Sequence, residues 1–144
     1  MFSKACEYAI RAMMFVSQKS KAGERVGIKA IVNGIDSPEY FMAKILQELS
    51  RKGLLQSTKG PNGGFFMDEA ARKVTLDKIV SAIDGDKVFV GCGLGLKACN
   101  EKKPCPIHDE FKLIRTKLKN MLETTQIGEF TENLEKGLSY LRRN

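Results

Sequence analysis

The chain has 144 residues, of which 42% are hydrophobic and 28% charged, a composition that excludes wholesale disorder. This length suits one domain with a single core and is too short for a two-domain enzyme with a cleft between its domains. The net charge is +7, and residues 1–83 carry 13 basic against 8 acidic side chains, so we expect a polyanionic partner to bind the first half.

No apolar run reaches the roughly 18 residues that a membrane span requires. The first 16 residues interleave Lys4, Glu7 and Arg11 with apolar side chains and lack a small-residue cleavage site. We therefore expect a cytoplasmic protein with neither a secretory signal nor a membrane partner.

Two helices are predicted at the start of the chain. Apolar residues at three- and four-residue spacing predict the first over residues 3–17, with Ser3 as its N-cap and Cys6 as a small buried side chain on its apolar stripe. After a polar loop, a second helix is expected over residues 28–33. We expect it to end at Gly34 as a left-handed C-cap.

The clearest helix start lies just after this short turn. Ser37 is predicted as N-cap, Pro38 as the first helical residue, and the helix is expected to end at residues 51–53. Two helices joined by such a short turn are typical of a helix-turn-helix. The residues that the second of them is expected to bury are Phe41, Ile45 and Leu49.

A β-hairpin is predicted next. Residues 54–59 form one strand, residues 60–64 a glycine-rich tip, and residues 65–67 the returning strand. The order helix, turn, helix, hairpin indicates a winged helix-turn-helix, whose tip can approach a phosphate backbone closely because glycine has no side chain. Such domains also serve as protein-interaction modules, but the basic excess in this half favours DNA.

The second half of the chain contains a short helix over residues 75–84, stopped by Gly85, and a long helix starting at Pro106. The long helix carries an apolar seam at heptad spacing and a basic opposite face. The seam requires a partner, either a second copy of the chain or the chain's own domain. A polar tail follows Glu129. The seam residues are Ile107, Phe111, Ile114, Leu118 and Met121, and the basic face comprises Lys112, Arg115, Lys117 and Lys119.

Three of the four cysteines, Cys92, Cys99 and Cys105, lie in a glycine-rich stretch without periodicity. As N-cap of the long helix, Cys105 would face the positive end of the helix dipole, which favours the metal-binding thiolate. His108 follows three residues later, as a fourth ligand or a solvated bystander. Three thiolates and one weaker ligand suit a tetrahedral zinc or an iron–sulfur cluster, and the wide spacing favours the cluster.

Several segments together resemble the IscR/NsrR-type family of bacterial winged helix-turn-helix transcription regulators, which carry iron–sulfur clusters. The resemblance runs from about Phe2 to Phe130. It implies a mainly α-helical homodimer with a small β-hairpin wing, a long dimerisation helix and a cluster whose state sets DNA affinity, as repressor or activator. The segments that carry it are residues 8–13, 49–54, 59–65 and 124–130, together with the three cysteines.

The resemblance also implies a set of cluster ligands. Cys92, Cys99 and Cys105 would bind a [2Fe–2S] or [4Fe–4S] cluster, which aerobic preparation can remove. The fourth ligand differs between branches of the family. It is either His108, or Glu7 of the partner subunit.

For DNA, the resemblance places the helix after Ser37 in the major groove and the hairpin in the minor groove of a duplex. Ala43 stands where some relatives carry an acidic residue that discriminates between operators. The residues implied to contact DNA are Ser37, Pro38, Tyr40, Ala43, Lys44 and Arg51 from the helix, with Lys59, Pro61 and Asn62 from the hairpin.

We expect a DNA-binding domain over residues 1–85, a cluster loop over 86–105, a dimerisation helix over 106–130 and a tail over 131–144. No cysteine pair lies on a βαβ pattern and no nucleophile, base and orienting group stand out, so we expect neither an enzyme nor a small-molecule substrate. Two alternatives stay open, a winged-helix interaction module with a structural zinc and a thiol-redox switch without a cluster.

Overall fold

Helices make up most of the fold, with one short β-hairpin between them. The computed structural model describes residues 1–143. The elements are α1 (Lys4–Lys21), α2 (Ile28–Ile35), α3 (Glu39–Arg51), β1 (Gln56–Thr58), β2 (Gly64–Phe66), α4 (Glu69–Arg72), α5 (Leu76–Asp84), α6 (Lys87–Val90), α7 (His108–Thr124), the 3₁₀ helix η1 (Ile127–Phe130) and α8 (Thr131–Glu135).

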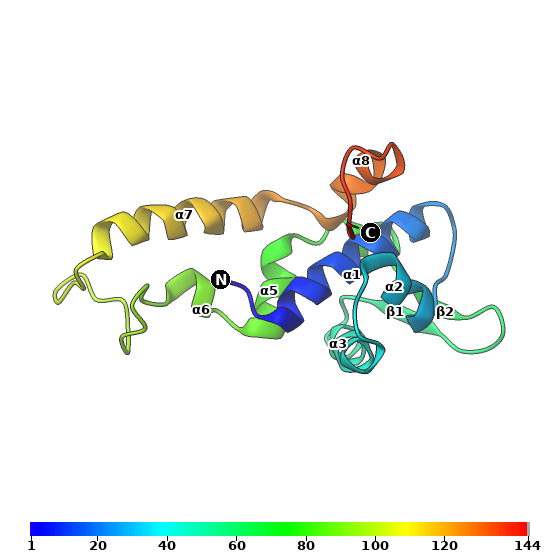
Figure 1. Cartoon of the computed structure of the whole chain (residues 1–144), viewed down its shortest axis with the longest axis horizontal. Coiled ribbons are helices and arrows are strands. Elements are labelled where there is room, and N and C mark those ends of the chain that lie inside the picture. The colour runs from blue at the N-terminus through cyan, green and yellow to red at the C-terminus, as the bar shows by residue number, and fades with distance from the viewer. Residues whose placement is uncertain (144) are drawn as a thin grey trace.

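The molecule has two regions of different shape (Figure 1). Helices α2, α3 and α5 pack around α1, and the β1–β2 hairpin projects from one end of this group. At the other end, α7 and the segment before it extend away from the group. We call residues 86–121 the arm, and the rest of the described chain the head.

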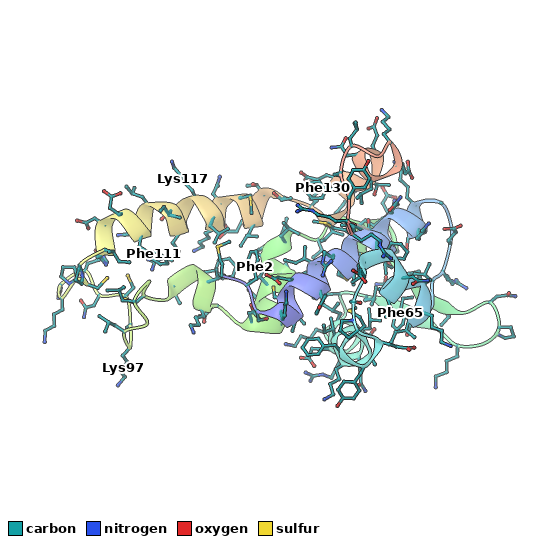
Figure 2. The ribbon with its side chains drawn as sticks, viewed as in Figure 1. Phe2, Phe65, Lys97, Phe111, Lys117 and Phe130 are labelled. Atoms are coloured by element: carbon teal, nitrogen blue, oxygen red, sulfur yellow. The ribbon has the colours of Figure 1, made fainter. Side chains whose placement is uncertain are left out.

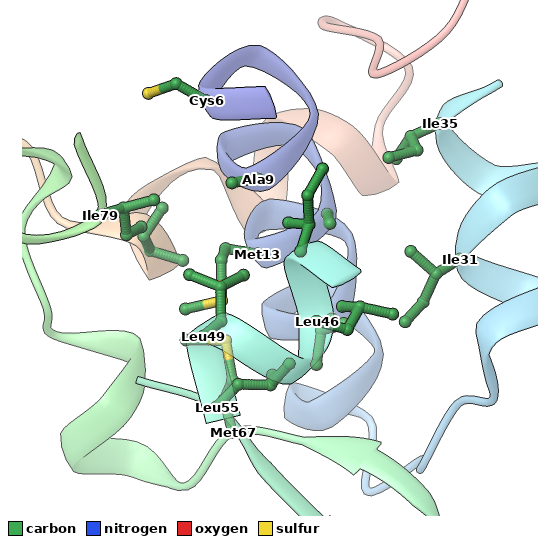
Figure 3. Close-up of a cluster of buried hydrophobic side chains, with 14 of the residues drawn as sticks. Cys6, Ala9, Met13, Ile31, Ile35, Leu46, Leu49, Leu55, Met67 and Ile79 are labelled. Atoms are coloured by element: carbon green, nitrogen blue, oxygen red, sulfur yellow. The ribbon is translucent and has the colours of Figure 1, made fainter. Parts of the chain in front are cut away.

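The core lies in the head, around α1. Small residues Ala9 and Ala12, both fully buried, let α1 approach its neighbours closely. Larger side chains from α2, α3, α5 and the hairpin fill the space around it (Figure 3). Each large side chain buried in this way stabilises the fold by about 1.5–3 kcal/mol. The central members of this core are Met13, Ile31, Leu46, Leu49, Leu55, Met67 and Ile79.

The start of α1 is fixed as predicted. The Ser3 hydroxyl accepts a hydrogen bond from the Cys6 backbone N–H (3.0 Å), which confirms Ser3 as N-cap. The Ser3 backbone N–H donates to the Asp84 carboxylate (2.9 Å), so the same turn ties α1 to the end of α5. Cys6 is fully buried, and this burial, with Asp84 nearby, raises the pKa of its thiol to about 12.

Gly34 is not the end of α2, contrary to the prediction. The helix continues to Ile35, and Asp36 takes the left-handed conformation (φ 55°) beyond it. Gly34 serves packing instead, since a Cβ there would lie 2.2 Å from a ring carbon of Phe15. The glycine lets α1 and α2 approach each other, a role that local sequence signals do not reveal.

The start and buried face of α3 also differ from the prediction. The helix begins at Glu39, with Pro38 rather than Ser37 at the N-cap position, and Ser37 is buried with no hydrogen-bond partner for its hydroxyl in the described chain. Phe41 is 40% exposed and packs edge-on against Tyr8, with ring centroids 5.8 Å apart. The buried stripe runs along the neighbouring face as Met42, Ile45, Leu46 and Leu49.

The predicted hairpin is present, and it is anchored to the loop between α1 and α2. Strands β1 and β2 pair antiparallel, with Ser57 opposite Phe65. Val26 and Phe65 exchange two backbone hydrogen bonds (2.7 and 3.0 Å), which adds a third, one-residue strand. A Cβ at Gly63 would lie 2.3 Å from the Thr58 carbonyl oxygen, so the tip requires glycine at this position.

The C-terminal segment, predicted as a polar tail, folds back onto the head. Thr131 is buried at the start of α8. Arg142 donates to the Asn33 carbonyl at the end of α2, and Arg11 Nη1 donates to the carbonyls of Ile35 (2.7 Å) and Leu141 (3.2 Å). The bonds to Asn33 and Ile35 satisfy carbonyl groups that the end of α2 leaves unpaired.

Candidate nucleic-acid interface and metal site

The solvent face of α3 presents the residues predicted to reach base edges. Tyr40 is 74% exposed, and the Lys44 ammonium lies 4.8 Å from the centre of its ring. This cation–π contact holds the lysine charge beside the ring. Pro38 and Ala43 are exposed on the same helix, whereas Ser37 is buried beneath it.

Arg51, at the end of α3, is engaged within the chain. Its guanidinium pairs with the Glu48 carboxylate (2.7 Å), and Lys52 contacts the same carboxylate (3.1 Å). Hydrogen bonds from these two cations lower the pKa of Glu48. Arg51 therefore offers less free positive charge to a phosphate than its exposure alone indicates.

The tip of the hairpin exposes the other predicted contacts, Lys59, Pro61 and Asn62. A small polar cleft opens beside the tip, and Arg25 from the loop between α1 and α2 lines it. We did not predict Arg25 as a site residue. The residue lies more than 30 positions from the tip, and only the backbone pairing of Val26 with Phe65 brings it there.

An aromatic contact with α1 supports helix α3. Tyr8 of α1 packs against Phe41, and the Arg11 guanidinium lies 5.0 Å from the Tyr8 ring centre. Because Arg11 also binds the Ile35 carbonyl, one side chain holds both the end of α2 and the ring that packs against α3.

The arm brings the cysteine-bearing loop alongside α7. Arg115 donates to the Gly91 carbonyl (2.6 Å), and a Cβ at Gly93 would lie 2.8 Å from the Phe111 ring. Figure 2 shows Lys97 of the loop and Phe111 of α7 at the end of the molecule opposite the hairpin. The loop is therefore held against the first half of α7 by both a hydrogen bond and close packing.

Helix α7 starts at His108 rather than at Pro106, which corrects the role predicted for Cys105. Ile107 keeps a non-helical backbone (φ −109°, ψ 16°), and the His108 N–H donates to the Cys105 carbonyl (3.0 Å). Cys105 thus lies in the turn before the helix and not at its N-cap. The turn buries His108 to 7% exposure, which excludes the solvated bystander.

The thiols and the histidine form two pairs. Cys99 Sγ lies 3.4 Å from His108 Nδ1. Cys92 Sγ accepts from the Leu94 N–H (3.4 Å), and the backbone N–H groups of Leu94 and Leu96, followed by the Cys105 thiol, lower the pKa of Cys92. Backbone N–H groups directed at a sulfur stabilise its thiolate, which is the metal-binding form.

These pairs are the right donor types for a cluster or zinc, but they do not meet at one point. Among residues 1–143, no three Cys, His, Asp or Glu side chains are close enough together to hold a metal ion. Glu7 is exposed on α1, where its carboxylate pairs with Lys4 (3.4 Å). A metal would draw the two pairs together, and the donor chemistry fits such a ligand.

A largely apolar groove of about 620 Å³ lies between α6, α7 and the start of α1, and Cys92 is on its wall. Phe2, Val88 and Phe111 are among the residues that line it. Along α7 and at Ile107, which precedes it, apolar side chains are left open to solvent. Their exposed fractions are 39% for Ile107, 63% for Leu113, 63% for Ile114 and 47% for Met121.

Comparison with known proteins gives the family. The pattern of the Rrf2 family, described as iron-dependent transcriptional regulator, matches residues 2–133. The chain belongs to the Rrf2 family. This confirms the expectation of a transcriptional regulator rather than an enzyme, and it agrees with the resemblance in the sequence.

Individual relatives agree with this membership. An HTH-type transcriptional regulator of Aquifex aeolicus is 28% identical over 139 residues, which are 95% of each chain. IscR of Escherichia coli is 26% identical over 136 residues, which are 89% of this chain and 78% of IscR. DNA-binding regulation by a helix-turn-helix is therefore supported.

Solved structures confirm the winged-helix fold. CymR, the global cysteine regulator of B. subtilis, matches with a TM-score of 0.75 at 18% identity, over 92% of this chain and 96% of CymR. T. potens IscR matches with a TM-score of 0.72 at 15% identity, over 96% of this chain and 91% of that protein. Within the described part of the chain, no helix has both the length and the apolar character to cross a membrane.

Proposed function

We propose that this protein is a homodimeric, DNA-binding transcription regulator whose operator affinity is set by an iron–sulfur cluster. Cys92, Cys99 and Cys105 would hold the cluster, with His108 or Glu7 of the partner subunit as the fourth ligand. The observation that carries the proposal is the buried His108 beside Cys99, at the turn that also contains Cys105. His108 is thus placed within reach of the cysteine loop rather than in solvent.

Dimerisation is the first part of the proposal. Apolar side chains with exposed fractions as high as 63% run along α7, and each would be buried if a second copy of the helix covered this face. Double-stranded DNA is the partner of the dimer. Helix α3 of each copy would be the recognition helix. The two recognition helices would read half-sites about one helical turn, roughly 34 Å, apart.

The chain's own contacts connect the cysteine loop to the recognition helix. Arg115 and Phe111 hold the loop to α7, and the far end of α7 is tied to α5 by the hydrogen bond from the Leu76 N–H to the Thr125 carbonyl (2.9 Å). At the end of α3, Lys52 donates to the Ala82 carbonyl in α5. A change in loop order can therefore reach α3 through packed elements.

A bound iron–sulfur cluster supplies a centre whose oxidation state and ligands change with conditions. A ligand shifts a protein between two states only by as much as it favours one of them. The loop residues must therefore be arranged differently with and without the cluster, and the separation of Cys99 and His108 from Cys92 and Cys105 leaves room for such a rearrangement.

Reconstitution tests the cluster. Protein purified without oxygen and supplied with iron and sulfide is expected to show visible absorption, with iron and acid-labile sulfide bound. Cys92→Ala, Cys99→Ala and Cys105→Ala are expected to lose the colour, whereas Cys6→Ala, which removes a thiol outside the loop, keeps it. Colourless protein with stoichiometric zinc would contradict the cluster and favour the structural-zinc alternative.

Binding to duplexes selected from a random library tests the switch. We expect cluster-loaded and cluster-free protein to differ in affinity for the selected duplexes at fixed salt. Equal affinities for every selected duplex would contradict a switch controlled by the cluster.

One observation favours a second function, a thiol switch without metal. The Cys105 thiol is among the groups that lower the pKa of Cys92, which indicates that these two thiols lie near each other. Hydrogen peroxide would join them in a disulfide, with two molecules of water as the other product. Metal-free protein treated with peroxide would then lose two free thiols, and the loss would be absent from Cys105→Ala.

A further inference from the structure

The loop between α1 and α2 contains a cation that the fold moves to the hairpin tip. Arg25 is exposed, and its guanidinium lies 4.9 Å from the centre of the Phe66 ring in β2. A guanidinium held over an aromatic face loses little further freedom when it binds a ligand. Within residues 1–143 it takes part in none of the ion pairs.

This side chain faces a cleft rather than open surface. Gly23 and Arg25 line one side of the cleft, and Pro61, Asn62 and Gly63 of the tip line the other. The lining is mostly polar and includes no acidic side chain. Glycines on both sides leave backbone groups accessible to a ligand.

The chemistry of the cleft suits an anion with several oxygen atoms. A guanidinium forms paired hydrogen bonds to phosphate oxygens, and the side-chain amide of Asn62 can donate another. Because Pro61 and Asn62 belong to the tip proposed to enter the minor groove, the phosphates nearest to Arg25 would be those of the strand beside the tip.

We propose that Arg25 and the hairpin tip form a binding site for a phosphate of the DNA backbone. The site adds a contact from the loop between α1 and α2 to those of the recognition helix and the hairpin. It rests on the proposed DNA-binding function, and it extends the footprint of the head along the duplex.

Salt dependence tests the site. Binding of a fluorescent 30-base-pair duplex of mixed sequence is measured by anisotropy at several salt concentrations. Each phosphate contact contributes about −0.9 to the slope of log K against log salt concentration. We expect Arg25→Ala to make the slope shallower by about 0.9, and Arg25→Lys, which keeps the charge, to retain the slope.

Lys117→Ala is the matched control, since it removes one positive charge from α7, far from the hairpin (Figure 2). It is expected to leave the slope unchanged. If Arg25→Ala behaves like Lys117→Ala while the unsubstituted protein binds the duplex, the phosphate site is wrong and DNA binding stands. If the unsubstituted protein fails to bind any duplex, the proposed function falls and this inference falls with it.

Discussion

Helices α1 and α7 are almost equally long, 18 and 17 residues, yet α1 buries six of its residues and α7 only two. Helix α1 is surrounded by the other helices of the head, whereas α7 contacts α5 near one end and the cysteine loop near the other. The difference is not one of composition, because Leu113, Ile114 and Met121 in α7 are as apolar as the residues that α1 buries. The head therefore carries its own stabilising core, while the arm leaves apolar side chains exposed that the proposed dimer would cover.

Thiol reactivity should separate the two regions most strongly. Burial and Asp84 raise the pKa of Cys6 in the head to about 12, whereas backbone N–H groups lower that of Cys92 in the arm. At pH 8 the thiolate fraction of Cys6 is then about a thousandfold below that of an ordinary cysteine. We expect iodoacetamide to modify Cys92 first in metal-free protein and to leave Cys6 intact, as followed by mass spectrometry.

Unfolded protein in urea provides the control, in which all four cysteines should react at similar rates. The pKa of Cys6 is higher in the folded state than its ordinary value near 9. The stabilisation that this difference gives to the folded state is therefore complete below pH 9. It is lost as the pH rises toward 12. If iodoacetamide modified Cys6 in the folded protein at a rate within tenfold of that of Cys92, the predicted difference in thiol reactivity between head and arm would be wrong.

Truncation of a methionine should affect the two regions differently. Met13 is fully buried in α1, so Met13→Ala is expected to lower the free energy of unfolding by about 2–5 kcal/mol. Met121, which is 47% exposed on α7, is its matched counterpart, and Met121→Ala should lower that free energy much less. Denaturant unfolding measures both, and equal losses would show that the arm is buried as deeply as the head.

A charge on the exposed face of α7 should act on assembly rather than on folding. Ile114→Glu is expected to weaken dimerisation at least about tenfold, because a carboxylate would replace an apolar side chain that the proposed dimer would bury. Sedimentation equilibrium measures the association. Thr116→Glu, on the other side of the helix, is the control and should leave the dimer intact, so equal effects of both substitutions would contradict an α7 interface.

The smallest expected effect concerns the hairpin alone. Lys59→Ala should weaken binding to all duplexes by a similar factor and make the salt slope shallower by about 0.9. Since Lys59 belongs to the head, the change in slope should be the same with and without the cluster. A slope change that depends on the cluster would show that the arm alters how the hairpin meets DNA.

The sequence predicts those parts of the fold that depend on neighbours along the chain. The Ser3 cap, the stop at Gly85 and the hairpin tip all follow from local backbone requirements, and the structure has each of them. Gly34 and Phe41 were assigned wrongly because their surroundings come from α1, through Phe15 and Tyr8. Spacing alone cannot reveal such long-range contacts.

The candidate site divides in the same way. The spacing of the cysteines and His108 indicates a metal-binding loop, but it does not show that Cys99 lies beside His108 while Cys105 lies beside Cys92. Those pairings depend on how the loop packs against Phe111 and Arg115. Arg25 was not predicted because the pairing of Val26 with Phe65, rather than proximity in sequence, brings it to the hairpin.

The bond from Arg142 to Asn33 connects the last part of the described chain to α2, and the bond from Arg11 to Leu141 connects it to α1, from which Arg11 also binds Ile35 at the end of α2. A proteolytic cut near Lys136 would free this segment and expose the final carbonyls of α2 to water. The core around Met13 would be left whole by such a cut, so the protein would still melt cooperatively. If α3 contacts DNA as proposed, we expect such a cut to weaken DNA binding before it lowers the melting temperature of the protein.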